Sequence, residues 1–421
     1  MSEAVRISSP SVNKRDRKLV LLVAGEASGD LHGANLVHAI KRICSEVVFC
    51  GIGGNDMARA GVTRFIKSED MAVVGLAEIF GKFRIHVEAA NILKSILKLH
   101  RPDLLILIDY PGFNLYMARI AKKMNIPVLY YISPQVWAWR RGRVKKIAKR
   151  VDRMAVILPF EKAFFEKSGI DVEYVGHPLI DAFEKMGKGS PHLTINNQQA
   201  DSAKVANATT AGSTINNPVV GLVPGSRREE ILNLLPVMIR AGELLKAEYP
   251  HIRFVLPLAE TISSDWLSRF VKNTKLDIEI YHEGIYGALN PCHLAFVTSG
   301  TATLDAAIMN VPMVVIYKAK SLTYQVGKRV IKVPYLGLVN LVAGECVAPE
   351  LIQDDVTPEK LAMAGKSFLT DGALRQQTIG KLKMVKENLG RGGASERTAR
   401  IAVGMMGCSG PAVAAALAES A

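Results

Sequence analysis

One aspartate follows the most apolar run of the chain. Asp109 comes directly after Leu104–Ile108 and before the turn-forming pair Pro111-Gly112. A carboxylate at the end of a buried strand can accept a proton from an incoming hydroxyl group, if its pKa suits the task. It can equally cap the next helix, although the neighbouring Asn114 could take that role instead. The sequence therefore predicts Asp109 to be either a general base or a helix cap.

A glycine-containing turn follows the first apolar run. In GEASGD, residues 25–30, two glycines allow a sharp turn before a helix. The N–H groups at that helix start can bind an anion or a polar sugar, so Gly25, Ser28 and Asp30 are predicted to contact substrate. An ordinary tight turn capped by Asp30 is the alternative. The spacing differs from G-x-G-x-x-G, so a dinucleotide fingerprint is absent.

The second half of the chain carries an arginine in a similar turn. Gly225, Ser226 and Arg227 follow the run Val219–Val223. Arginine forms charge-assisted bidentate contacts with phosphate oxygens, so this turn is predicted to clamp a pyrophosphate. A capping box with Ser226 as the cap and Glu229 at its third helical position is compatible with the same residues.

Small and hydroxyl residues also follow the run Leu294–Thr298. Ser299, Gly300 and Thr301 suit a phosphate at a helix start, and Asp305 could accept hydrogen bonds from ribose hydroxyls. The chain contains no D-x-D metal motif. If the donor is a nucleotide sugar, we therefore expect Arg227 and the helix termini to balance the leaving diphosphate, with no metal or cofactor.

Two tryptophans stand beside a dense run of cations. SPQVWAWR, residues 133–140, contains Trp137, Trp139 and Arg140, and Arg143 with six further basic residues follows by position 153. Such a segment can meet anionic lipid, where each cation contributes roughly 1 kcal/mol, or a phosphorylated acceptor. A solvated helix face accounts for some of these charges. Nucleic-acid binding fits the charge, but the aromatic interleaving is minimal and no known module matches.

Short apolar runs alternate with amphipathic stretches along the chain, which is typical of α/β folds with buried parallel strands. The rhythm stops in the polar stretch 187–217 and then restarts, so we predict two doubly wound domains facing a central cleft. The predicted strands are Leu19–Ala24, Val47–Cys50, Leu104–Ile108, Val128–Ile132, Met154–Leu158, Val219–Val223, Arg253–Pro257, Leu294–Thr298 and Val314–Tyr317, with helices such as Leu31–Ile43 and Leu115–Met124. The predicted divisions are an extension 1–17, a first domain 18–186, an insertion 187–217, a second domain 218–370, helices 371–400 and a tail 401–421.

The composition is that of a basic chain without a disulfide framework. The 421 residues carry 53 Lys and Arg against 39 Asp and Glu, a net charge of +14, which favours an anionic partner. Five scattered cysteines with no C-x-x-C pair are typical of reduced cytosolic thiols. The polar N-terminus has no apolar signal-peptide region. The uncharged stretch 401–418 contains Gly and Pro and is rich in Ala, which favours a loosely packed tail over a membrane anchor.

The motifs together resemble the lipid-A-disaccharide synthase family in order and spacing, between residues 18 and 400. The resemblance rests on AGEASGD (24–30), IDYPGFN (108–114), SPQVWAWR (133–140), LPFE (158–161), GHPL (176–179), PGSRREEI (224–231), SGTATLDAA (299–307), 314–318, LVNLVAG (338–344) and PELIQ (349–353). The insertion 187–217 and both ends of the chain depart from the family pattern without touching a motif.

The resemblance implies a GT-B fold and an inverting transferase that joins a UDP-activated diacylated glucosamine to diacylated glucosamine 1-phosphate through a β-1,6 bond. It implies that Asp109 deprotonates the acceptor hydroxyl, that Arg227 holds the diphosphate, and that Asn340 lines the nucleotide pocket with 299–305. It also implies a cytoplasmic enzyme on the inner membrane, whose apolar stretch 71–100, with Val74, Leu76 and Ile79, faces the anionic lipid surface. A homodimer formed by exchange of C-terminal segments is a further implication.

Two other readings of the same residues stay open at this stage. One is another GT-B enzyme that uses a UDP-sugar, such as a peptidoglycan glycosyltransferase or a UDP-sugar epimerase. The other is a basic nucleic-acid-binding protein. Phosphate contacts alone weaken steeply with salt, so duplex binding that persists near physiological salt would support the second reading.

Overall fold

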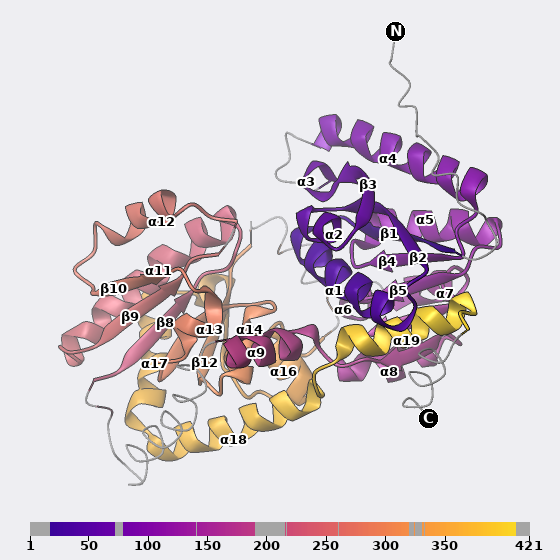
Figure 1. Ribbon diagram of the computed structural model, residues 1–421. Coiled ribbons are helices and arrows are strands. Elements are labelled where there is room, and N and C mark those ends of the chain that lie inside the picture. The colour runs from indigo at the N-terminus through magenta and orange to yellow at the C-terminus, as the bar shows by residue number, and fades with distance from the viewer. Residues whose placement is uncertain are drawn as a thin grey trace.

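The computed structural model describes residues 17–71, 79–139, 141–189, 215, 217–259, 261–319, 324, 331 and 333–409, with the backbone alone at 69, 79–83, 139, 141 and 187–189. Two wholly parallel sheets organise these residues (Figure 1). The first sheet has the order β3-β2-β1-β4-β5-β6-β7, and the second has the order β10-β9-β8-β11-β12-β13. The predicted α/β class with two doubly wound halves is confirmed.

The first sheet is made of β1 (Lys18–Ala24), β2 (Val47–Gly53), β3 (Val62–Lys67), β4 (Leu104–Ile108), β5 (Val128–Tyr131), β6 (Arg153–Val156) and β7 (Asp171–Tyr174). Its helices are α1 (Ala27–Ile43), α2 (Asn55–Arg59), α3 (Ser68–Met71), α4 (Ile79–His100), α5 (Pro111–Lys123), α6 (Val136–Trp139), α7 (Val144–Ala148), α8 (Pro159–Glu166) and α9 (Pro178–Gly189), with a 3-10 turn at Arg141–Arg143. Every residue of β4 is buried because helices cover both faces of the sheet, which explains its unbroken apolar sequence.

The second sheet is made of β8 (Val219–Val223), β9 (Arg253–Pro257), β10 (Ile278–Tyr281), β11 (Leu294–Thr298), β12 (Met313–Tyr317) and β13 (Glu350–Ile352). Its helices are α11 (Arg228–Glu248), α12 (Ser264–Val271), α13 (Gly284–Leu289), α14 (Ala302–Ile308), α16 (Leu338–Ala343), α17 (Pro358–Thr370) and α18 (Gly372–Asn388), with a 3-10 turn at Gln353–Asp355. The last helix, α19 (Ala394–Met406), lies on the first half of the molecule (Figure 1).

The strand order reverses once in each sheet. In the first sheet the reversal lies between β1 and β4, where Ala24 pairs with Ile108, and in the second it lies between β8 and β11. Ligands of open α/β sheets bind beyond the carboxyl ends of the strands at such a reversal. The four turns singled out from the sequence follow these four strands.

The chain passes between the halves a second time near its end. Helix α9 belongs to the first half in sequence but contacts the second, where the Tyr286 hydroxyl donates to the Leu179 carbonyl at 3.3 Å. Helix α18 lies along the second half, and α19 then packs against α1 (Figure 1). The two passages therefore tie the halves together in opposite directions.

These two passages are bonded to each other. The His177 backbone N–H donates to the Leu389 carbonyl at 2.9 Å. The Arg397 guanidinium donates to the carbonyls of Val175 at 2.9 Å, Gly392 at 2.9 Å and Arg391 at 2.7 Å. On the other side, the Asp181 carboxylate accepts from the N–H groups of Gly393 and Ala394 at the start of α19.

The predicted boundary at residue 401 is wrong. Residues Ile401–Met406 belong to α19, and Ile401, Ala402 and Val403 are buried. The seemingly uncharged tail therefore begins as the inward face of a packed helix. The predicted insertion overlaps the end of α9, and most of 187–217, the extension 1–16 and residues 410–421 lie outside the described residues. Within the part that the structure describes, no helix is both long and apolar enough to span a membrane.

We expect Arg397→Met to destabilise the protein by roughly 2–3 kcal/mol, because three charge-assisted hydrogen bonds to backbone carbonyls are lost at once. The thermal midpoint, followed by circular dichroism, should fall by several degrees. The matched control is Arg42→Met, which removes an exposed ion pair to Glu396 on the same helix pair and should change stability by less than about 1 kcal/mol. Equal losses in the two variants would contradict this role of Arg397.

Candidate active site

The turn after β4 has two consecutive residues in the left-handed region. Asp109 has φ +46° and Tyr110 has φ +48°, although neither is glycine. Such conformations are strained and persist only where neighbouring contacts fix them. Here the Asn114 side-chain amide donates to the carbonyls of Ile108 at 3.1 Å and Asp109 at 2.7 Å, and the Tyr130 hydroxyl donates to the Asp109 carbonyl at 2.6 Å.

This geometry decides the capping question. Helix α5 begins at Pro111 with Tyr110 as its N-cap residue and has no side-chain cap. Neither predicted cap is therefore correct: Asp109 precedes the cap position, and Asn114 is a fully buried residue of the helix that holds the strained turn from behind. The side chain of Asp109 is left for another role.

The carboxyl group of Asp109 is half-buried at the carboxyl end of β4. Burial raises its pKa to about 6, and the nearby negative charge of Glu26 raises it further in the same direction, while a backbone hydrogen bond at Tyr110 opposes both effects. At neutral pH the group is mostly ionised yet more basic than an exposed aspartate. Those are the properties of a general base.

Tyr110 joins this turn to the turn after β1. A Cβ atom on Gly25 would lie 2.5 Å from the Tyr110 ring, so only glycine fits there. The Tyr110 hydroxyl donates to the Met71 carbonyl at 2.9 Å and lies 2.6 Å from His86 Nε2, whose ring stacks on the tyrosine. The structure thus brings Gly25, Glu26 and Asp109 together, as the strand order predicts.

Asp30 has a different role from the predicted one. The N-cap residue of α1 is Glu26, and Asp30 is a buried residue of the first turn. Its carboxylate accepts from the N–H groups of Gly54 at 2.7 Å, Asp56 at 2.9 Å and Met57 at 3.0 Å, and so holds the turn after β2. Ser28 is exposed on the same first turn of α1.

In the second half, the turn after β8 presents an arginine to solvent. Gly225 has φ +108°, and a Cβ atom there would come within 2.2 Å of the Glu230 carboxylate. The N-cap residue of α11 is Arg227 with Glu230 three residues on, so the predicted capping box of Ser226 and Glu229 is wrong by one residue. The Arg227 side chain is 73% exposed and only 3.4 Å from Glu230 Oε1.

The turn after β11 is accessible at its tip and closed behind. Thr301 is exposed, Gly300 has φ +146°, and the Ser299 hydroxyl donates to the Leu336 carbonyl at 2.8 Å. Asp305 lies on the buried face of α14, 7% exposed, and burial raises its pKa to about 7, with a hydrogen bond from Tyr286 opposing that shift. Its burial differs from the open position that a ribose contact requires.

Asn340 is fully buried and its side chain is used within the protein. Its amide donates to the Ala348 carbonyl at 2.7 Å and to Glu350 Oε1 at 2.8 Å, and its oxygen accepts from the N–H groups of Val347 and Ala348. Glu350 in turn accepts from the N–H groups of Leu336 and Gly337, beside the turn after β11. Asn340 therefore positions that region through Glu350, a residue that sequence reasoning missed.

Trp137 is a core residue, so its predicted contact with membrane or acceptor is wrong. It is 4% exposed, its indole N–H donates to Glu161 at 2.9 Å, and its ring packs edge-on against Phe160. The buried Glu161 also accepts from the Ser133 hydroxyl at 2.6 Å and from the N–H group of Leu158 at 3.0 Å. This one carboxylate therefore joins the motifs SPQVW and LPFE, and two residues of each surround it.

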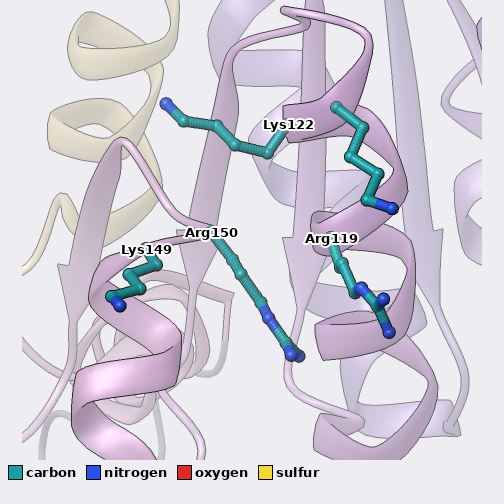
Figure 2. A pocket seen from close by; sticks show the side chains of 5 residues that line it. Arg119, Lys122, Lys149 and Arg150 are labelled. Atoms are coloured by element: carbon teal, nitrogen blue, oxygen red, sulfur yellow. The ribbon is translucent and has the colours of Figure 1, made fainter.

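Of the other residues predicted to contact a membrane or acceptor, Val74, Leu76 and Arg140 lie outside the described residues, as do the side chains of Ile79 and Trp139. Arg143 is exposed. Downstream of it, a pocket of about 260 Å³ is lined entirely by the cations Arg119, Lys122, Lys123, Lys149 and Arg150. Figure 2 shows Arg119 and Lys122 on one helix and Lys149 and Arg150 on the neighbouring segment.

Solved structures share this two-sheet architecture. A UDP-GlcNAc 2-epimerase from Neisseria meningitidis, bound to UDP-GlcNAc, superposes with a TM-score of 0.60 at 13% identity, covering 92% of this chain and 100% of that one. MurG from Acinetobacter baumannii gives a TM-score of 0.54 at 12% identity, covering 91% and 98%. At these identities the likeness establishes the fold, and the fold is GT-B.

Sequence comparison gives the family within that fold. The family model for lipid-A-disaccharide synthetase matches residues 20–402. Proteins named lipid-A-disaccharide synthase from Geobacter metallireducens and Coxiella burnetii (strain CbuK_Q154) are 46% and 43% identical to this chain. The alignments cover 93% and 91% of this chain and 98% and 97% of the relatives. The chain belongs to the lipid-A-disaccharide synthetase family, which confirms the resemblance seen in the motifs.

The Asp109 carboxyl should titrate near pH 6, and Glu26→Gln should lower that pKa because it removes a neighbouring negative charge that disfavours ionisation. Carboxyl-carbon NMR with labelled aspartate measures the shift directly, and Asp109→Asn identifies the resonance. Glu279→Gln, an exposed change in the second sheet, is the matched control and should leave the titration in place. An unchanged pKa in Glu26→Gln would show that burial alone sets the value.

Proposed function

We propose that the protein transfers diacylated glucosamine from its UDP-activated form to the 6-hydroxyl of diacylated glucosamine 1-phosphate, giving a β-1,6-linked disaccharide and UDP. The observation that carries this proposal is the family match across 20–402, within which the half-buried Asp109 stands at the strand reversal. The family match does not favour an epimerase, a peptidoglycan glycosyltransferase or a nucleic-acid-binding protein.

In this proposal Asp109 is the base. Its carboxylate takes the proton of the acceptor hydroxyl as the oxygen attacks the anomeric carbon and UDP departs from the opposite face, which inverts the configuration. A pKa of about 6 keeps the group ionised at neutral pH while leaving it more basic than a free aspartate. The locked backbone at Asp109 and Tyr110 supports the role, because a base must be held in position before the substrate arrives.

The second half would bind the donor. Arg227 stands exposed at the start of α11, where a guanidinium and free N–H groups can share the charge that develops on the leaving diphosphate. Gly225, Ser226, Ser299, Gly300 and Thr301 would line the phosphate and ribose region. Asp305 and Asn340 would act from behind by fixing those turns, since their side chains are buried.

Both substrates are lipids in this proposal, so the enzyme would act at the cytoplasmic surface of the inner membrane. The apolar stretch 71–100 and the basic segment 140–153 would form the contact surface. The all-cation pocket adjoins the end of this basic segment and would add attraction to anionic headgroups (Figure 2). A homodimer remains a prediction from the resemblance.

The reaction is tested by UDP release from a UDP-diacylglucosamine donor in detergent, with and without the diacylated glucosamine 1-phosphate acceptor. Release should require the acceptor, and mass spectrometry should find the disaccharide 1-phosphate. Acceptor-independent turnover of the donor, or turnover of UDP-GlcNAc to an epimer, would refute the proposal.

Asp109→Asn should lower kcat by roughly 10²–10⁴-fold, because the amide keeps the shape of the side chain but accepts no proton. KM for the donor and the thermal midpoint should change little. The exposed Asp354→Asn serves as the matched control.

The pH profile of the native enzyme gives an independent check of the base. Below pH 6 the carboxyl is protonated, so kcat/KM should fall roughly tenfold per pH unit. Near-normal turnover by Asp109→Asn, or a profile that stays flat between pH 7 and 5, would exclude Asp109 as the base.

Replacing Val74, Leu76 and Ile79 together with Ser should abolish the salt-resistant part of binding to anionic vesicles. Apolar burial resists salt, whereas attraction between cations and anionic lipid is screened by it. Flotation with vesicles in high salt measures the difference, and unchanged UDP binding controls for folding. A triple variant that still floats in high salt would place the anchor elsewhere, with 401–418 the next segment to test.

A further inference from the structure

Two cysteines that are far apart in sequence meet where the first and last helices end. Cys44 is the C-cap residue of α1, and Cys408 follows α19 by two positions. Their Sγ atoms are 3.2 Å apart, although 364 positions separate the residues. Both side chains are partly exposed, in contrast to the buried Cys50 and Cys292. A small reagent can therefore reach this pair.

We propose that Cys44 and Cys408 form a modification site, at which a low-molecular-weight disulfide such as glutathione disulfide oxidises them to a reversible intrachain disulfide. An S–S bond is about 2.0 Å long, so the sulfurs must approach by about 1.2 Å. Each cysteine lies beyond the last residue of its helix, and its backbone bond, Cys44 N–H to Ile40 or Cys408 N–H to Val403, involves no strand. The adjustment can thus be made without breaking a sheet.

The exchange balances in two steps. The Cys44 thiolate attacks one sulfur of glutathione disulfide, forming a mixed disulfide and releasing one glutathione thiol. The Cys408 thiolate then attacks the Cys44 sulfur, forming the protein disulfide and releasing the second glutathione. Two protein thiols lose two electrons and two protons in total, and the oxidant becomes two thiols.

The environment sets this order. Burial raises the pKa of the Cys408 thiol to about 12, and its hydrogen bond and charge interaction with Cys44 add to the increase, while the Lys18 ammonium group opposes it. Cys408 is therefore a poor first nucleophile. Once Cys44 carries glutathione, both contributions from Cys44 disappear, so the pKa of Cys408 falls and its attack becomes easier.

The bond would fasten the last helix to the first. Helix α19 supplies buried residues to the core beneath α1, among them Ala399, Ala402 and Val403. A link between 44 and 408 closes nearly the whole chain into a loop and removes conformations from the unfolded state. Oxidation should therefore raise the thermal midpoint, and a reductant should reverse the rise.

The test incubates the full chain with glutathione disulfide, quenches it in acid, and alkylates under denaturing conditions. Mass spectrometry should count a fall from five free thiols to three. A non-reducing digest should contain one peptide pair linking Cys44 to Cys408 within a monomer, and dithiothreitol should restore all five thiols.

Three variants make the result specific. Cys44→Ser and Cys408→Ser should form no link and show no rise in thermal midpoint on oxidation. Cys346→Ser removes an exposed thiol elsewhere and should behave like the native chain. Separate glutathione adducts on Cys44 and Cys408, a link between two chains, or reaction of Cys346 alone would each overturn the proposal.

Discussion

The first sheet is not fully covered until the end of the chain returns to it. The core that contains Val20, Leu22 and Ile106 also contains Ala399, Ile401 and Val403 from α19. The chain must therefore build the whole second half and then pass back. That passage runs beside the outward one and is bonded to it through Arg397 and Asp181. Because both covalent passages meet at this one place, any change in the angle between the halves must be accommodated there.

The candidate base depends on a chain of backbone support that reaches back to the same sheet. Asp109 and Tyr110 hold left-handed conformations that cost energy, and Asn114 and Tyr130 hold the turn from the buried side. On the open side, the Tyr110 ring fills the space that a side chain at position 25 would need. Burial at this packed turn is also the main reason for the raised pKa of Asp109. Strain, packing and basicity at this position thus have one origin.

The sequence predicted the central strands well and missed the outer ones. Leu104–Ile108, Val219–Val223 and Leu294–Thr298 were predicted with the observed bounds, because strands buried on both faces are continuous apolar runs. The strands without a prediction, β3, β7, β10 and β13, are the four at the edges of the two sheets. An edge strand is only partly buried and carries charges such as Glu173 and Glu279. Its alternation is too short to distinguish from a loop.

The sequence located the candidate site but did not separate its surface from its support. Gly25, Asp109 and Arg227 follow strands at the two reversals, and that placement needs only strand order and the ends of apolar runs. Whether a polar side chain points outward or inward depends on the residues that pack against it. Asp30, Trp137 and Asn340 occur in specific motifs, yet each spends its polar atoms on the protein's own backbone or on a buried carboxylate. A buried polar group must find its partners within the fold, so such a residue is as tightly constrained as one that binds a ligand. Motif specificity alone therefore identifies the region of a site, and burial is needed to assign the roles within it.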